Sequence, residues 1–243
     1  MNDGASYLEL SRRYGFAPKP ESASRLTQLV SRQDADLDEI AKVIDKDPSL
    51  RARLLRVANP EAENEAEYAI ETVEDALMRN GVGCVLVLAM STPLAAALVK
   101  TFQTMLSLQI ETIDPRTAPA LAGEHLRCNI DFSGKVVGHV LLRLGAAAGR
   151  LIAAGILGTT PEEMTDMNEV RDVAGELLNI MTGNFKSNLC DAGLECKLSP
   201  PDVRSTTDFT PPVVRAGSVE HLAFSSGKIQ IYVEVTANPW SDD

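Results

Sequence analysis

The stretch Asp172-Val-Ala-Gly-Glu-Leu-Leu-Asn-Ile-Met-Thr-Gly-Asn184 predicts a helix with one buried face and one unusual exposed face. At about 100° per residue, the apolar residues here and just beyond recur at helical spacing along one broad arc. This arc, the expected core side, contains Val170, Val173, Ala174, Leu177, Leu178, Ile180, Met181 and Phe185. The opposite arc contains Asp172, Glu176, Asn179 and Gly183.

The centre of the exposed arc has no Lys or Arg, although such residues usually solubilise the water-facing side of a helix. Glu176 and Asn179 are three residues apart, so a helix places their side chains next to each other. Gly183 follows on the same face and weakens the helix. A face with these features predicts that a partner docks closely against it.

Several segments of the sequence together resemble the CheX and CheC family of chemotaxis phosphatases. They are Asp172 with Glu176-x-x-Asn179, Gly183-Asn184, Leu198-Ser-Pro-Pro201, Phe102-Gln-Thr-Met-Leu-Ser-Leu108 and Asn129-Ile-Asp-Phe-Ser-Gly-Lys-Val-Val-Gly-His-Val-Leu-Leu142. Because these segments occur in the right order, the resemblance is fairly specific, and it covers roughly residues 92 to 238.

This resemblance implies an enzyme that hydrolyses the phosphoaspartate of a CheY-like receiver domain in chemotaxis or another two-component pathway. It implies that Asn179 orients the attacking water and that Glu176 pairs with a lysine of the receiver's active site. Gly183 would give the partner room to approach, and Asp172 would add a contact at the edge. The Mg²⁺ ion would be bound by the receiver, so no cofactor is expected on this chain. The resemblance also implies a homodimer.

A second interpretation stays open beside this one. The domain could be a catalytically inactive signalling or scaffold module that binds a receiver domain or another partner through the same helix face. The presence of both Glu176 and Asn179 favours the phosphatase. The scaffold interpretation is favoured by the helical segment fused to the amino-terminal side of this domain, which is described next.

The amino-terminal region is predicted to be helical. Short amphipathic helices are expected over residues 21–32, 36–44 and 48–59, followed by a polar loop over 60–68 and a further helix from Thr72. The segments Pro18-x-Pro20, Asp36 to Ile44 and Asp47 to Asn59 resemble the opening half of an HDOD domain, a helical signalling module related to HD hydrolases but without their metal ligands. We therefore expect a truncated HDOD-like domain over 7–90 and a CheX-like phosphatase domain over 92–238. The first is either a docking surface or a relic that packs against its neighbour.

The remaining pattern predicts an α+β fold, a CheX-like sheet with long helices preceded by a small all-α HDOD-like bundle. Helices are expected over residues 92–107, 146–157 and 168–191, and strands over 108–113, 126–132, 136–144, 194–198, 216–224 and 229–235. The strands at 126–132 and 136–144 form one predicted hairpin, and the last two form another. A flexible polar connection is expected from Pro200 to Pro212.

Composition and charge exclude several classes of function. With 23 basic and 34 acidic residues the net charge is −11, which argues against nucleic acid and anionic membrane surfaces as partners. Four cysteines without paired spacing and three separated histidines predict neither a zinc site nor a disulfide framework. Such thiols, and the absence of a signal-peptide pattern at the amino-terminal end, favour the cytoplasm.

Two further patterns have structural interpretations. Gly81 to Val99 carries no charge, but Ser91-Thr92-Pro93 favours two buried helices, with a break at Thr92, over one membrane span. His139 lies in an apolar strand and is interpreted as a packed residue, and Asn184 as a structural amide. His125 and His221 have no carboxylate or cysteine close in sequence to form a hydrolase triad.

Overall fold

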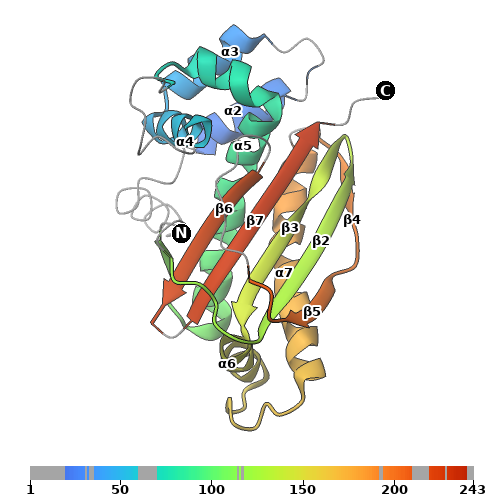
Figure 1. The fold of residues 1–243 in the computed structure, drawn as a ribbon. Helices are drawn as coiled ribbons and strands as arrows, with labels where there is room; N and C mark the ends of the chain where they lie inside the picture. The colour runs from blue at the N-terminus through green and yellow to red at the C-terminus, as the bar shows by residue number, and fades with distance from the viewer. Residues whose placement is uncertain are drawn as a thin grey trace.

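The fold joins a small helical bundle to one end of an antiparallel sheet, and long helices cover one face of that sheet (Figure 1). The computed structural model describes residues 20–30, 32, 36–59, 70–113, 115, 118–191, 194–209, 219–227 and 229–239. The predicted α+β class, with the helices of the bundle preceding the sheet, is confirmed.

The sheet has the strand order β1-β6-β7-β3-β2-β4, with β5 also paired to β2. Its strands are β1 (Glu111–Ile113), β2 (His125–Gly134), β3 (Val136–Gly145), β4 (Cys196–Leu198), β5 (Asp202–Thr206), β6 (Val219–Ser226) and β7 (Ile229–Pro239). Both predicted hairpins are present, because β2 pairs with β3 and β6 pairs with β7. The first hairpin turns at Gly134, whose φ of 150° lies in a region that side chains rarely adopt.

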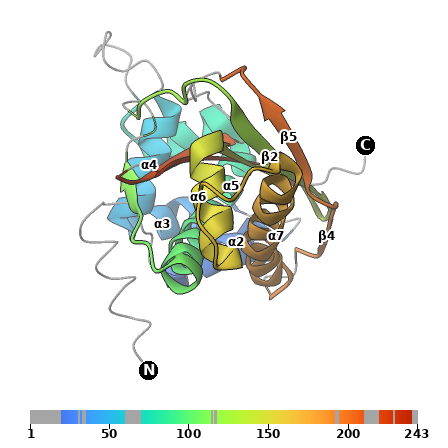
Figure 2. The same ribbon diagram turned by 90° about the horizontal axis from the view of Figure 1, so that it is seen from below.

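Three long helices lie on the same side of the sheet: α5 (Val73–Leu106), α6 (Ala146–Leu157) and α7 (Met167–Asp191) (Figure 2). Side chains alternate across each strand, so Val140, Leu142 and the paired Val235 all face these helices and are buried. Helix α7 begins where expected, since the Asp166 carboxylate accepts a hydrogen bond from the Asn168 amide at 2.8 Å. The main core of the protein lies between this helical layer and the sheet.

The predicted break at Ser91-Thr92-Pro93 is wrong. Helix α5 continues through Pro93, and its non-helical residue is Gly81, with φ 71° and ψ 176°. Gly81 can adopt this backbone conformation because it has no Cβ, and a side chain at this φ would be strained although the surrounding space is open. Around Pro93, the buried Leu88, Leu94 and Leu98 hold both sides of the helix in the core, and this packing outweighs the missing backbone donor.

The predicted flexible connection from Pro200 is also partly wrong, because it contains strand β5. This strand pairs with β2 in a register that runs from Asp202 opposite Asn129 to Thr206 opposite His125. Its sequence, Asp-Val-Arg-Ser-Thr, lacks the regular apolar alternation that reveals a half-buried strand. Residues 210–218, which include the end of this connection and the start of the second predicted hairpin, lie outside the described residues.

The amino-terminal helices are α2 (Pro20–Val30), α3 (Leu37–Asp45) and α4 (Pro48–Ala58). Side chains cap three helix starts: Asp36 accepts from the Asp38 amide, Asp47 from the Ser49 amide, and Thr72 from the Asp75 amide. All three helices pack against α5. The predicted loop at 60–68 and residues 7–19 lie outside the described residues. In the described ranges no helix is long and apolar enough to cross a membrane.

Candidate functional site

The exposed face of α7 is open to solvent. Asp172, Glu176 and Asn179 are exposed and Gly183 is half-buried, which matches the predicted polar arc. No hydrogen bond or ion pair within the described part of the chain involves the Glu176 carboxylate or the Asn179 side-chain amide. Both groups are therefore available to another molecule.

The opposite face of α7 is fixed in the core. Six residues of the predicted core arc are buried, namely Val170, Ala174, Leu177, Leu178, Met181 and Phe185, while Val173 and Ile180 are half-buried at its margins. The Phe185 ring packs against Phe132 of β2 with 5.6 Å between ring centroids. The helix can thus hold the exposed side chains in fixed positions on a rigid element.

A groove of about 480 Å³ runs between the first half of α7 and strand β5. It is lined by Asn168, Arg171, Asp172, Gly175, Glu176, Pro201, Asp202 and Val203. The groove therefore contains Asp172 and Glu176 of the predicted face, whereas Asn179 and Gly183 lie further along the same helix. The four predicted residues thus follow one another along α7, and the first two lie in the groove.

The wall of the groove depends on a close approach at Gly175. A Cβ on this residue would lie 3.2 Å from the Val203 Cγ2 atom and 3.5 Å from the Pro201 Cγ atom. Pro201 belongs to the Leu198-Ser-Pro-Pro201 segment singled out in the sequence, so the structure brings that segment to the predicted helix face. Gly175, Asp202 and Val203 were not predicted as site residues, because their contribution depends on the pairing of β5.

The charges in the groove are mixed. Asp202 is paired with Arg204 at 2.9 Å, and Arg171 donates to the Asn168 side-chain oxygen at 3.2 Å. Asp172 and Glu176 contribute two further carboxylates at the surface. In the described residues there is no cluster of His, Cys, Asp or Glu that could hold a metal ion.

His139 and His221 lie together on the sheet, away from this groove. His139 Nε2 lies 3.0 Å from a Glu234 oxygen, and His221 Nδ1 lies 3.6 Å from the other oxygen of that carboxylate. The hydrogen bond with His139 holds the pKa of Glu234 below its usual value. Because the neighbouring Val140 and Leu142 face the helices, these groups lie on the other face of the sheet, away from α7. His139 is a half-buried, paired residue in the sheet.

Comparison with known proteins identifies two family regions. Residues 126–225 match the family model described as chemotaxis phosphatase CheX, and residues 17–113 match the HDOD domain. The chain combines an HDOD domain with a CheX domain. The CheX domain includes all of α7 and the groove, whereas the HDOD match includes α2 to α5 and β1. No curated protein matches the chain.

Two solved structures share the fold of about 61% of this chain. The chemotaxis protein CheX from Vibrio vulnificus is 24% identical, with a TM-score of 0.51, over 61% of this chain and 96% of that chain. A CheC-like superfamily protein from Shewanella sp. PV-4 is also 24% identical, with a TM-score of 0.50, over 61% and 97% of the two chains. A CheX–CheY–BeF3–Mg²⁺ complex from Borrelia burgdorferi is 17% identical, with a TM-score of 0.49, over 61% and 97%.

Proposed function

We propose that the CheX domain hydrolyses the phosphoaspartate of a CheY-like receiver domain. The observation that carries this proposal is the Glu176 and Asn179 pair, exposed and adjacent on a helix whose other face is fixed in the core. Membership of the CheX phosphatase family supplies the reaction class. Water attacks the phosphorus, the bond to the aspartate oxygen breaks, and the products are aspartate and inorganic phosphate.

Phosphoryl transfer of this kind requires positioning and charge neutralisation more than covalent participation by the protein. The Asn179 amide can accept a hydrogen bond from water and donate one to a phosphoryl oxygen, so it can hold the nucleophile in line. The Glu176 carboxylate accepts from a cationic group of the receiver and fixes the depth of insertion. Asp172, in the groove, contacts the edge of the partner. The receiver supplies the Mg²⁺ ion.

The second candidate function is a non-catalytic module that binds a receiver domain or another signalling protein through the same surface. The groove between α7 and β5 supports this function, because it could hold part of a partner protein without any reaction taking place there. In both functions the HDOD domain, over the predicted range 7–90, is a docking surface or a relic beside the CheX-like range 92–238. The homodimer and the cytoplasmic location also stay predictions.

The test is a receiver dephosphorylation assay. Receiver domains from the same genome are phosphorylated with a small phosphodonor in the presence of Mg²⁺, and decay of the phosphoaspartate is followed with and without the full-length chain. We expect wild type to accelerate decay and the double variant Glu176→Ala/Asn179→Ala not to do so. If a receiver binds the wild-type chain but its phosphoaspartate decays at the unassisted rate, the protein is a binding module instead.

Gly183 gives a prediction that separates docking from folding. A Cβ at Gly183 would meet nothing within 4 Å, so Gly183→Ala fits the free protein. We expect it to raise the free energy of unfolding by about 0.5–1 kcal/mol, because alanine is the better helix former. If a receiver packs closely there, the same methyl group should slow dephosphorylation about tenfold, since overpacking a close contact costs about 1–3 kcal/mol.

Urea unfolding and the decay assay, made on the same Gly183→Ala preparation, measure the two effects. Ser187→Ala, one turn further along α7, is the control, because this exposed side chain loses only the hydrogen bond that its hydroxyl donates to the Gly183 carbonyl oxygen at 3.2 Å. A more stable Gly183→Ala variant with undiminished activity would show that the partner does not approach this part of the helix.

A further inference from the structure

A buried ion pair joins the two family regions. Arg53 of α4 lies in the HDOD match and Glu220 of β6 lies in the CheX match. The Arg53 Nε atom donates to a Glu220 oxygen at 3.1 Å, and its Nη2 atom donates to the other oxygen at 2.6 Å. The side chains are 3% and 5% exposed. Both charges are therefore removed from water and depend on each other.

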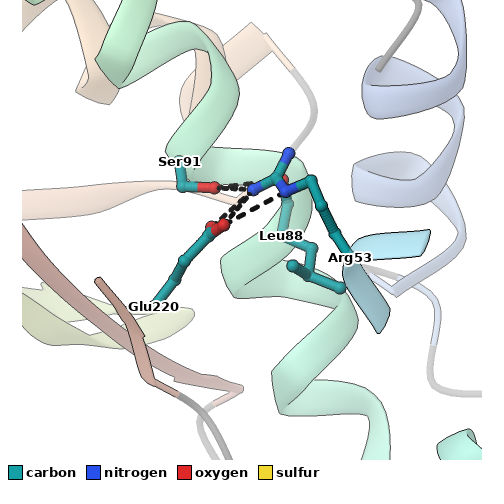
Figure 3. Close-up of polar contacts among 4 residues, drawn as sticks. All are labelled: Arg53, Leu88, Ser91 and Glu220. Carbon is teal, nitrogen blue, oxygen red and sulfur yellow. Dashed lines mark hydrogen bonds and ion pairs between the residues drawn. The ribbon is translucent and has the colours of Figure 1, made fainter. Parts of the chain in front are cut away.

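Helix α5 provides the third member of this network. The Arg53 Nη2 atom also donates to the Ser91 hydroxyl at 2.6 Å, and that hydroxyl donates to the Leu88 carbonyl oxygen at 3.2 Å. Figure 3 shows the contacts of the Arg53 guanidinium group with both the Ser91 hydroxyl and the Glu220 carboxylate. We call Arg53, Ser91 and Glu220 together the clamp. One side chain thus connects the bundle, α5 and the sheet.

Burial makes the clamp a strong constraint on how the protein can open. A bundle that moved away from the sheet would leave Glu220 without its cation, or would have to expose the carboxylate to water. Breaking a buried pair by losing one partner typically costs several kcal/mol, because the other charge stays uncompensated. The bundle also packs along α5, which continues down to contact α7 and β7. Separate movement of the bundle therefore breaks two kinds of contact.

We propose that the clamp makes the HDOD domain and the CheX domain one cooperative folding unit, with the bundle held in a fixed position on the sheet. The packing of the bundle then contributes to the free energy of unfolding of the CheX domain. It does not swing across the α7 face, which is exposed while the bundle is in place. A molecule that binds α2 to α4 would stabilise α7 as well, because both regions share one opening equilibrium.

Two native thiols report on the two regions. Cys84 of α5 is buried near the clamp, and burial together with the Glu220 charge raises the pKa of its thiol to about 12. Cys128 of β2 is buried in the sheet, and burial raises the pKa of its thiol to about 12 too. Both thiols are unreactive while the structure is closed, since the thiolate is the reactive form. Their labelling rates therefore measure opening.

The experiment compares labelling of Cys84 and Cys128 by a thiol reagent in the full-length chain, followed by mass spectrometry under conditions where closing is faster than labelling. For Arg53→Met we expect both thiols to be labelled about 10² to 10³ times faster, and by the same factor. The reason is that Glu220 then stays buried without its cation, which makes opening easier. In the double variant Arg53→Met/Glu220→Met no charge stays buried, so both rates should return most of the way to wild type.

Two further variants keep the test decisive. Ser91→Ala removes a hydrogen bond but leaves the ion pair, and should accelerate both thiols together by about two- to tenfold even if Arg53→Met does not fold. Arg51→Met is the matched control on the same helix. Arg51 pairs with Asp45 at 3.3 Å, with side chains that are 46% and 49% exposed, and donates to the Glu71 carbonyl oxygen at 3.0 Å. Both contacts are exposed to water, so neither thiol should respond.

Faster labelling of Cys84 with no change at Cys128 would overturn the proposal, since the bundle would then open independently of the sheet. Unchanged labelling of both thiols in Ser91→Ala and Arg53→Met would overturn it as well. A double variant that is labelled faster than either single variant would show that the two charges do not act as a pair.

Discussion

Replacing Asn179 by alanine is expected to slow assisted dephosphorylation by about 10² to 10³-fold, while the receiver still binds. The reason is that positioning a reacting group is worth about this much when the group acts in the transition state. The Asn179 side chain is exposed and makes no hydrogen bond or ion pair within the described part of the protein, so its removal should leave the fold unchanged. The rate at saturating receiver and the dissociation constant, measured separately, check both parts of the result.

Glu176→Ala should give a different pattern from Asn179→Ala. In the proposed mechanism Glu176 holds the receiver in register, so its loss should weaken binding in addition to slowing the reaction. Asn129→Ala is the matched control for loss of an amide, since Asn129 lies on the far side of β2 and contacts Asp131. If Asn179→Ala dephosphorylates the receiver as fast as wild type, the water is positioned by another group and the assignment of Asn179 is wrong.

The largest expected effect on stability is that of Phe185→Ala. This ring is 1% exposed and packs on Phe132, so its removal leaves a cavity between α7 and the sheet. We expect the free energy of unfolding to fall by about 3–5 kcal/mol, as is usual for a buried phenylalanine. Urea unfolding followed by circular dichroism measures it.

The matched control for Phe185→Ala is Leu157→Ala, at the end of α6, where the leucine is 49% exposed. This change should have a small effect on stability, because little apolar area leaves the core. A loss below about 1 kcal/mol in Phe185→Ala would mean that the surrounding side chains collapse into the space, and that α7 is held less firmly than its burial indicates.

Several predictions that depend on local patterns agree with the structure. The two faces of α7, the two hairpins and the starts of α3 and α5 each follow from periodicity or from residues a few positions apart. Such features are encoded in a short window because the backbone repeats every few residues. The CheX and HDOD resemblances were likewise visible in ordered sequence segments, and the matches over 126–225 and 17–113 confirm them.

The failures have a common cause. Nothing local distinguishes Pro93 in a continuous helix from Pro93 at a helix start, because the deciding factor is the packing of α5 in the core. Strand β5 has no apolar alternation and forms because its backbone pairs with the edge of β2. The sequence by itself determined the helix with its two faces and the exposed positions of Glu176 and Asn179 on it.

The tertiary structure alone decided that β5 walls a groove at Gly175, and that Arg53 meets Glu220 across 167 positions of the chain. Contacts between residues far apart in sequence have no periodic signal, since they depend on how whole elements pack.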